Sequence, residues 1–333
     1  MPRVQGCITP AVRLPPIFLH ISLPATLGPG HTAQDDTEFY DMSHIAYVNG
    51  RYLPHNSATV HIEDRGYQFA DGVYEVALIW NGIPVDYSGH MVRLWRSMDE
   101  LRMKAPMSPA AMTVVVQEVV RRNLFKTGIV YIQVNRGVAP RAHPFPSGDV
   151  KASMVVTAKA FAGSSDAMAE QGAKVVTARD IRWERRDIKS VGLLANALAR
   201  QGAAEQKAYE ALLVKDDGTV TEASASNAWI ITADKAIVTH PTTNAILGGI
   251  TRQTVMKLAK DAGYKVDERP FTLAEAKSAK EVFLTGTTTF VMPISQIDDQ
   301  PVANGAAGLI SLDLRKRYRN YMESLDAATA WNV

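Results

Sequence analysis

Cysteine is almost absent from this chain of 333 residues, in which Cys7 is the only one. A single cysteine excludes an intramolecular disulfide and a cysteine-rich metal site, and it favours a reducing, cytoplasmic location. The sequence also lacks an apolar run of the roughly 20 residues that a membrane helix needs. Its net charge of +2 is too small for a typical nucleic-acid binder. We therefore expect no metal, no nucleic acid and no membrane as a partner.

Acidic residues are missing from the start of the chain, where Asp35 is the first. Residues 1–41 are rich in proline and show no pattern of a packed element. We interpret them as a disordered extension or as a translation start assigned too early, because "MSHIAYVNGRYLP" from Met42 reads as a fresh beginning. A signal or transit peptide is the alternative.

The remaining composition is that of a globular protein, with 46% hydrophobic and 21% charged residues. The length predicts two domains, each large enough to bury its own core. The stretch "AGSSDAMAEQG" is small and polar, which is typical of a linker. We therefore predict domains at 42–161 and 172–333, joined by a linker at 162–171.

Secondary structure is predicted from spacing and turn residues. Asn49-Gly50 and Asn81-Gly82 each lie within alternating apolar runs, which predicts two β-hairpins. Helical spacing marks "GHMVRLWRSMDELRM" and "SPAAMTVVVQEVVRRNL", the second with Ser108 as its N-cap, and later "GITRQTVMKLAKDAG" and "SLDLRKRYRNYMESL". Strands and helices mix without the regular alternation of a Rossmann sheet, so we expect an α+β or mixed α/β fold.

Lys189 stands in "RRDIKSVGLLANALARQ", between a polar lead-in and an apolar run with helical spacing. A free lysine has a pKa of about 10.4 and is a poor nucleophile at neutral pH. A carbonyl cofactor such as pyridoxal phosphate removes this limit by holding the lysine as a Schiff base. Lys189 is therefore either a covalent anchor or a solvated charge at a helix N-terminus.

Glu222 lies among small residues in "TVTEASASNAWII", just before an apolar strand. An acidic side chain there could pair with a protonated pyridine nitrogen, which makes the ring an electron sink. A glutamate in a turn is the simpler alternative.

Two stretches offer hydroxyl groups and free backbone amides for a phosphate. In "LGGITRQTV", Ile250 and Thr251 open a predicted helix, whose N-terminus attracts anions. In "LTGTTTFV", Thr287 follows a strand and a glycine, which suits a phosphate-binding turn. A run of threonines is otherwise ordinary in a β-rich region.

Arg141 and His143 are two residues apart in the proline-rich loop "NRGVAPRAHPFPSG". In extended geometry both side chains can point the same way. A guanidinium beside an imidazole is suited to binding a carboxylate. A solvated arginine and an incidental histidine are the alternative.

Together these motifs resemble the class IV, or fold-type IV, pyridoxal-phosphate aminotransferases, and most closely the D-amino acid aminotransferases. The resemblance runs from about Ile45 to Glu323. Six motifs occur in the family's order and spacing: "EDRGYQFADGVYEV", "PRAHPFP", "RDIRWERRDIKSVGLL", "VTEASASN", "GITR" and "TGTTTFVMPI".

The resemblance implies a role for each cofactor-binding residue. Lys189 is similar to the family's Schiff-base lysine, which is also its general acid–base, and Glu222 to the carboxylate at the pyridine nitrogen. The cofactor's phosphate and ring would be held by Arg93, Ile250, Thr251, Thr287 and, against the ring, Leu247.

The resemblance also implies how the substrate is bound. Tyr74 would join Arg141 and His143 around the substrate α-carboxylate. Gly286 departs from the pattern, because close relatives carry a serine there beside the phosphate-binding threonine. Its expected consequence is the loss of one hydrogen bond to the phosphate.

The family implies a small N-terminal domain, a larger C-terminal domain, a cofactor in the cleft between them, and a homodimer. It implies ping-pong transamination of D-amino acids of the D-alanine type, with 2-oxoglutarate or pyruvate as acceptor. Branched-chain L-amino acid aminotransferases, (R)-selective amine transaminases and aminodeoxychorismate lyases share the fold and remain alternatives. A non-catalytic pyridoxal-phosphate binder is a further alternative, although such a protein would not need Glu222 as well as Lys189.

Overall fold

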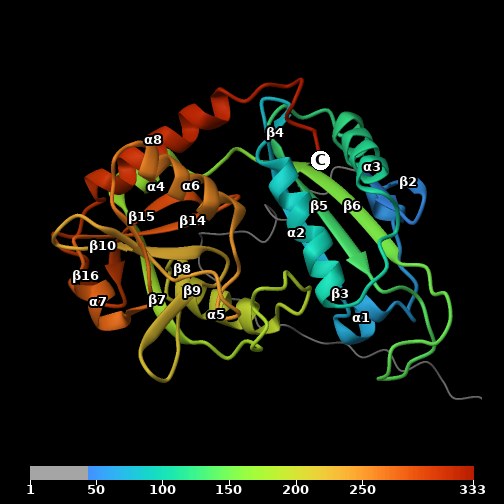
Figure 1. The fold of residues 1–333 in the computed structure, drawn as a ribbon, viewed down its shortest axis with the longest axis horizontal. Coiled ribbons are helices and arrows are strands. Elements are labelled where there is room, and N and C mark those ends of the chain that lie inside the picture. The colour runs from blue at the N-terminus through green and yellow to red at the C-terminus, as the bar shows by residue number, and fades with distance from the viewer. Residues whose placement is uncertain (1–43) are drawn as a thin grey trace, which may run out of the picture. The chain divides into compact units, whose positions relative to one another are not determined.

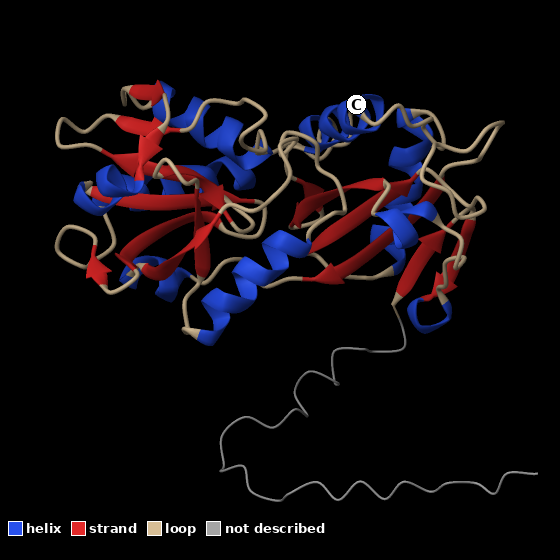
Figure 2. Cartoon of the chain, turned by 90° about the horizontal axis from the view of Figure 1, so that it is seen from below, coloured by secondary structure: helices blue, strands red, loops and turns tan. Residues whose placement is uncertain are grey.

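The computed structural model describes residues 44–333, which form two β-sheets with helices packed on them (Figure 1 and Figure 2). This mixture of helices and mainly antiparallel strands confirms the expected α+β class. The expectation for residues 1–41 lies outside the described residues.

The first sheet has six antiparallel strands in the order β2-β1-β6-β5-β3-β4. These strands are β1 (Ile45–Val48), β2 (Arg51–Pro54), β3 (Gly72–Trp80), β4 (Ile83–Pro84), β5 (Gly128–Asn135) and β6 (Ser153–Ala160). Both predicted hairpins are confirmed. Asn49 and Gly50 have φ of 47° and 94°, and Asn81 and Gly82 have φ of 50° and 85°. Positive φ at both central residues is the geometry of the tight hairpin turn that Asn-Gly favours.

Two helices, α2 (Tyr87–Glu100) and α3 (Pro109–Arg122), cover one face of this sheet. Their apolar sides share one core with the strands, which explains the helical spacing read from the sequence. Ser108 caps α3 as predicted, since its Oγ accepts a hydrogen bond of 3.3 Å from Ala111 N. A short 3-10 helix η1 (His55–Ser57) and helix α1 (Arg65–Phe69) connect β2 to β3.

Alternation along β3 decides which side chains reach the site. Val73 and Ala77 enter the core beneath α2 and α3. Glu75 lies on the same side and contacts Arg93 of α2. Tyr74 therefore projects from the opposite face of the strand, where it lines a cavity.

The second sheet has ten strands, nine of them in the order β12-β11-β10-β14-β15-β7-β8-β9-β13, with β16 paired to β15. Their bounds are β7 (Ala173–Arg179), β8 (Glu210–Val214), β9 (Thr219–Ala223), β10 (Asn227–Ile231), β11 (Ile237–Thr239), β12 (Val266–Glu268), β13 (Phe271–Thr272), β14 (Glu281–Gly286), β15 (Phe290–Ile297) and β16 (Gln300–Pro301). Strand β7 runs parallel to both β15 and β8. Leu284 and Phe283 enter different cores, so this sheet is covered by apolar side chains on both faces.

The helices of this half are α4 (Asp166–Gln171), α5 (Leu194–Glu205), α6 (Ile250–Asp261), α7 (Leu273–Ser278) and α8 (Leu309–Glu323). Helices α6 and α8 share a core with one face of the sheet. The stretch expected to be a plain linker contains α4, because Ser165 caps it by accepting a hydrogen bond from Met168 N. Arg315 of α8 binds Asp166 at the start of α4 at 2.9 Å and ties the segment down.

The domain division at 162–171 stays a prediction, although the two sheets fall on either side of that segment. Within residues 44–333, no helix combines the length and the apolar character needed to cross a membrane.

Candidate active site

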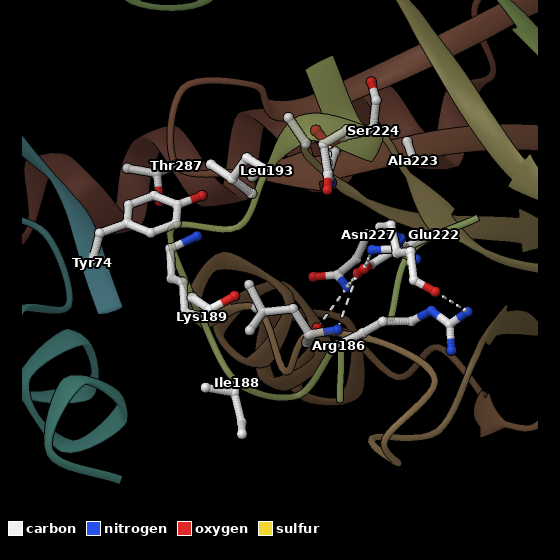
Figure 3. Close-up of a pocket in the computed structure, with 18 of the residues that line it drawn as sticks. Tyr74, Arg186, Ile188, Lys189, Leu193, Glu222, Ala223, Ser224, Asn227 and Thr287 are labelled. Atoms are coloured by element: carbon white, nitrogen blue, oxygen red, sulfur yellow. Dashed lines mark hydrogen bonds and ion pairs between the residues drawn. The ribbon is translucent and has the colours of Figure 1, made fainter. Parts of the chain in front are cut away.

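A cavity of about 350 Å³ brings together side chains from both sheets (Figure 3). It is lined by parts of β3 and α2 and by residues from β9, β14, α5 and α6. Most residues expected at the site line it: Tyr74, Arg93, Lys189, Glu222, Leu247, Ile250, Thr251 and Thr287. These residues are up to 213 positions apart in the chain (74 to 287), so the fold alone brings them together.

Lys189 lies in a turn that is fixed against β3. Ser190 forms an isolated bridge with Val73, and Tyr74 N donates a hydrogen bond of 3.0 Å to Lys189 O. The Lys189 Nζ is 4.2 Å from the centroid of the Tyr74 ring, a cation–π contact on one side of the cavity (Figure 3). No carboxylate of residues 44–333 pairs with this Nζ, so the amine is available for chemistry.

Glu222 lies on β9 with its carboxylate almost fully buried at the cavity. Its Oε1 contacts Arg182, while its Oε2 accepts hydrogen bonds from Leu247 N at 3.1 Å and Asn227 Nδ2 at 3.2 Å. Burial raises the pKa of Glu222 above its ordinary value, and Arg182 opposes that rise. The group is thus a buried acid whose charge depends on its cationic neighbours.

Helix α6 begins at the cavity, and no side chain of residues 44–333 caps its N-terminus. Gly249 is the N-cap residue, followed by Ile250 and Thr251, and all three line the cavity. A Cβ at Gly249 would overlap Oδ1 of Asn227, so glycine is required for this close approach. Free N–H groups and the helix dipole together make such an end an anion-binding site.

Arg93 reaches the same end of the cavity from α2. Its Nε and Nη2 bind Glu75 at 2.7 and 2.8 Å, and its Nη1 donates to Gly248 O at 2.8 Å. His90 Nδ1 is 2.7 Å from the same carboxylate. Burial alone would raise the pKa of Glu75, but Arg93 and His90 lower it to about 2. This buried ionised glutamate fixes the guanidinium beside the start of α6.

Thr287 follows β14 and lines the cavity next to Gly286. A Cβ at Gly286 would lie 3.2 Å from Ser226 Oγ, which itself binds the buried Glu210 at 2.8 Å. Position 286 therefore adjoins a hydroxyl network. On either side of it, Thr285 and Thr287 both line the cavity, and the Thr285 hydroxyl accepts a hydrogen bond of 2.9 Å from Trp229 Nε1.

Arg141 and His143 do not line the cavity of the single chain. Both are exposed, and both contact Phe69: the Arg141 guanidinium is 4.6 Å and the His143 ring 5.7 Å from its ring centroid. Their role at a substrate carboxylate stays a prediction.

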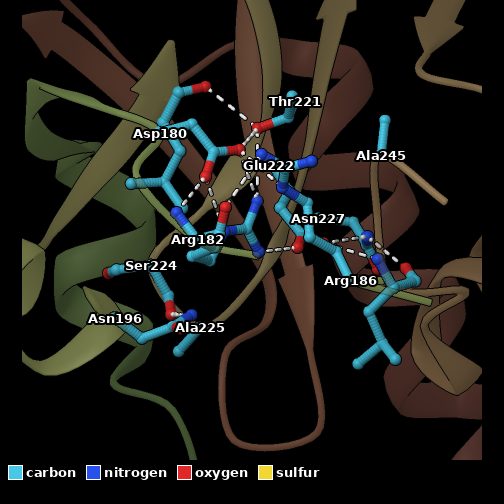
Figure 4. A network of polar contacts seen from close by, with 12 residues as sticks. Asp180, Arg182, Arg186, Asn196, Thr221, Glu222, Ser224, Ala225, Asn227 and Ala245 are labelled. Atoms are coloured by element: carbon cyan, nitrogen blue, oxygen red, sulfur yellow. Dashed lines mark hydrogen bonds and ion pairs between the residues drawn. The ribbon is translucent and has the colours of Figure 1, made fainter. Parts of the chain in front are cut away.

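Sequence reasoning missed a group of polar residues behind Glu222. Arg182 and Arg186 line the cavity, and both pair with the fully buried carboxylate of Asp180 (Figure 4). The only sequence signal was the density of charge in "RDIRWERRD" just before Lys189.

Comparison with known proteins identifies the family. Residues 72–297 match the family model of the class IV amino-transferases. The chain belongs to this family. This class IV aminotransferase is 40% identical over 282 residues to the D-alanine aminotransferase of Bacillus licheniformis, a match that covers 84% of this chain and 98% of that protein. A D-alanine aminotransferase of Listeria innocua is 40% identical over 272 residues, with coverages of 81% and 93%.

Solved structures agree with this assignment. The class IV aminotransferase resembles the branched-chain amino acid aminotransferase of T.th. with pyridoxamine 5′-phosphate, with a TM-score of 0.77 and 29% identity. That match covers 84% of this chain and 93% of the solved chain.

Proposed function

We propose that this class IV aminotransferase uses pyridoxal 5′-phosphate to move the amino group of a D-amino acid, of the D-alanine type, to a 2-oxo acid such as 2-oxoglutarate or pyruvate. The observation that carries the proposal is the Lys189 amine facing the same cavity as the buried Glu222. The similarity to D-alanine aminotransferases over nearly their whole length supports the substrate class.

The residues present fit this cofactor. The uncapped start of α6, with Ile250, Thr251 and nearby Thr287, offers donors for a phosphate. Lys189 offers the amine for a covalent bond to an aldehyde. Glu222 offers a buried carboxylate to a protonated ring nitrogen. We assign Arg93 to the phosphate as well and Leu247 to the ring.

The chain's own contribution to transamination is positioning and proton transfer. When bound, pyridoxal phosphate supplies the electron sink for a carbanion at the substrate Cα. Once the amino group of the substrate has replaced Lys189 on the cofactor, the freed Lys189 Nζ would be the base that removes the Cα proton, because it is held over the Tyr74 ring and pairs with no carboxylate of residues 44–333. Glu222 holds a proton on the ring nitrogen by presenting a negative charge to it.

Binding of the substrate α-carboxylate is assigned to Tyr74, Arg141 and His143. Tyr74 lines the cavity, whereas the other two lie beside Phe69, outside its lining. We propose that the chain is a homodimer in which a second copy brings this loop to the cavity.

Two further assignments complete the proposal. We place the enzyme in the cytoplasm, because its one cysteine forms no intramolecular disulfide. We also propose that the two sheets mark a small domain at 42–161 and a larger one at 172–333.

The experiment is a substrate panel with purified enzyme, comparing D-alanine, L-leucine and (R)-1-phenylethylamine with 2-oxoglutarate and pyruvate as acceptors. We expect the highest kcat/KM with D-alanine. A preference for L-leucine would make the enzyme a branched-chain aminotransferase, the activity of the solved neighbour. A preference for the amine would remove the need for a carboxylate site.

A further inference from the structure

Glu222 is held from behind by a chain of charged residues. Arg182, in the loop after β7, places Nη1 on Glu222 Oε1. Its Nε and Nη2 grip Asp180 Oδ1 and Oδ2 at 2.9 and 2.8 Å, a two-pronged pair. Thr221 Oγ1 also donates to Asp180 Oδ2 at 2.7 Å (Figure 4). One guanidinium thus bridges two buried carboxylates.

All three side chains of this bridge are buried, so their charges depend on one another. The side chain of Arg182 is 9% exposed, that of Glu222 is 6% exposed and that of Asp180 is fully buried. A charge withdrawn from water in this way stays ionised only when an opposite charge compensates it. Arg186 adds a second cation, with Nε at 3.2 Å from Asp180 Oδ2. The two positive charges of Arg182 and Arg186 therefore compensate the two negative charges of Asp180 and Glu222.

The orientation of Glu222 follows from the same contacts. Its Oε2 is held by Asn227 and by the backbone N–H of Leu247, both neutral donors. Among residues 44–333, Arg182 is the partner of its Oε1. Arg182 is the one cation among these contacts, so it favours the ionised carboxylate more strongly than the neutral Leu247 N–H does.

We propose that Arg182, fixed by Asp180, is a positioning residue that keeps the Glu222 carboxylate ionised and oriented for the ring nitrogen of the cofactor. The proposal rests on the proposed role of Glu222. In addition, the role of Glu222 depends on Arg182, which need not touch the cofactor. Asp180 acts indirectly, because it holds the Arg182 guanidinium that holds Glu222.

The pH dependence gives the proposal a distinctive signature. Burial raises the pKa of Glu222, Arg182 lowers it, and Asp180 behind Arg182 raises it again. Without Arg182, the effect of burial dominates and the pKa of Glu222 rises, so the carboxylate ionises only at higher pH. If activity needs ionised Glu222, the fall of kcat on the acidic side of the pH profile, its acidic limb, should occur at higher pH in the variant. The kcat of the variant should recover in part in alkaline buffer.

The test compares Arg182→Met and Arg182→Lys with Glu222→Gln in the holoenzyme. Arg179→Met is the matched control, because Arg179 also binds an aspartate but with its side chain 70% exposed. Steady-state kcat and KM for D-alanine are measured across pH. The second readout is the ratio of affinities for pyridoxal phosphate and its 1-deaza analogue, which lacks the ring nitrogen.

For Arg182→Met we expect kcat to fall by about 10- to 100-fold, by analogy with the loss found when the hydrogen-bond partner of a metal-ligating side chain is removed. KM should change little, the acidic limb should move up, and the preference for pyridoxal phosphate over the deaza analogue should shrink. Arg182→Lys should restore part of each effect, because it keeps a charge without the planar fork. Arg179→Met should match the parent.

The outcomes separate the two claims. If Glu222→Gln keeps the parental kcat and cofactor preference, the assignment of Glu222 is wrong and the inference falls with it. If Glu222→Gln loses both while Arg182→Met keeps both, only the inference about Arg182 is overturned. Should Arg182→Met fail to fold, Arg182→Gln replaces it, because glutamine removes the charge but keeps a hydrogen-bond donor. Parental kinetics and cofactor preference in Arg182→Gln would then refute the inference.

Discussion

Gly249→Ala is the smallest change that probes the start of α6. The added Cβ would overlap Oδ1 of Asn227 and lie 3.3 Å from Arg252 Cβ. Asn227 is buried, so its amide must turn away and give up hydrogen bonds to Leu247 O at 2.8 Å and to Glu222 at 3.2 Å. Losing a neutral hydrogen bond costs about 0.5–1.5 kcal/mol and one to a charged group about 1.5–3 kcal/mol. We expect a loss of roughly 2–4 kcal/mol in the free energy of unfolding.

Gly202→Ala is the matched control, because it makes the same chemical change inside helix α5, where the added Cβ would meet no atom of residues 44–333 within 4 Å apart from its own helix backbone and chain neighbours. Alanine in a helix interior stabilises by about 0.5–1 kcal/mol relative to glycine, so the two variants should move in opposite directions. Urea unfolding and pyridoxal phosphate affinity are the measurements. Gly249→Ala should also bind the cofactor more weakly, since α6 and Glu222 are both disturbed. Parental stability and parental affinity in Gly249→Ala would refute the close-approach argument.

Three further changes test other parts of the site. The pKa of Glu75 is lowered from 4.5 to about 2, which corresponds to about 3 kcal/mol of stability that is present above pH 4.5 and is lost as pH falls through about 2. Glu75→Gln should lack this contribution at pH 7 in urea unfolding, and the gap to the parent should close toward pH 2. Gly286→Ser should tighten cofactor binding by about threefold to tenfold, because it adds one hydroxyl, whereas Gly286→Ala should not. Arg141→Ala should lower kcat/KM for D-alanine by an amount that corresponds to about 2–5 kcal/mol of activation free energy, without weakening cofactor binding. Arg141→Lys should not restore kcat/KM fully. Equal loss of cofactor affinity in Arg141→Ala would contradict its assignment to the substrate.

Local sequence features predicted the local structure well. Asn-Gly pairs determine the two hairpins because few other residues adopt positive φ at both turn positions, as Asn49 and Gly50 do. Ser108 marked the start of α3 because a hydroxyl that accepts from the backbone is a short-range signal. The capped helix α4 was missed because the polar composition of 162–171 suits an irregular segment equally well.

Residues that act through distant partners were harder to predict. Lys189 and Glu222 could be named because their motifs resemble those of a family, and the fold places both at one cavity. Arg182 gave no comparable signal, because its partners become apparent only when the loop after β7 lies against β9. The spacing of Arg141 and His143 predicted that both point the same way, but not which surface they face.

The covalent anchor is the central claim of this account, and reduction with borohydride tests it most directly. The enzyme is reduced with bound pyridoxal phosphate, digested and mapped by mass spectrometry. We expect the pyridoxyl label on Lys189, no label after Lys189→Ala, and loss of turnover in that variant, while the exposed Lys104 stays unlabelled. A label on any other lysine, or full turnover by Lys189→Ala, would contradict the account.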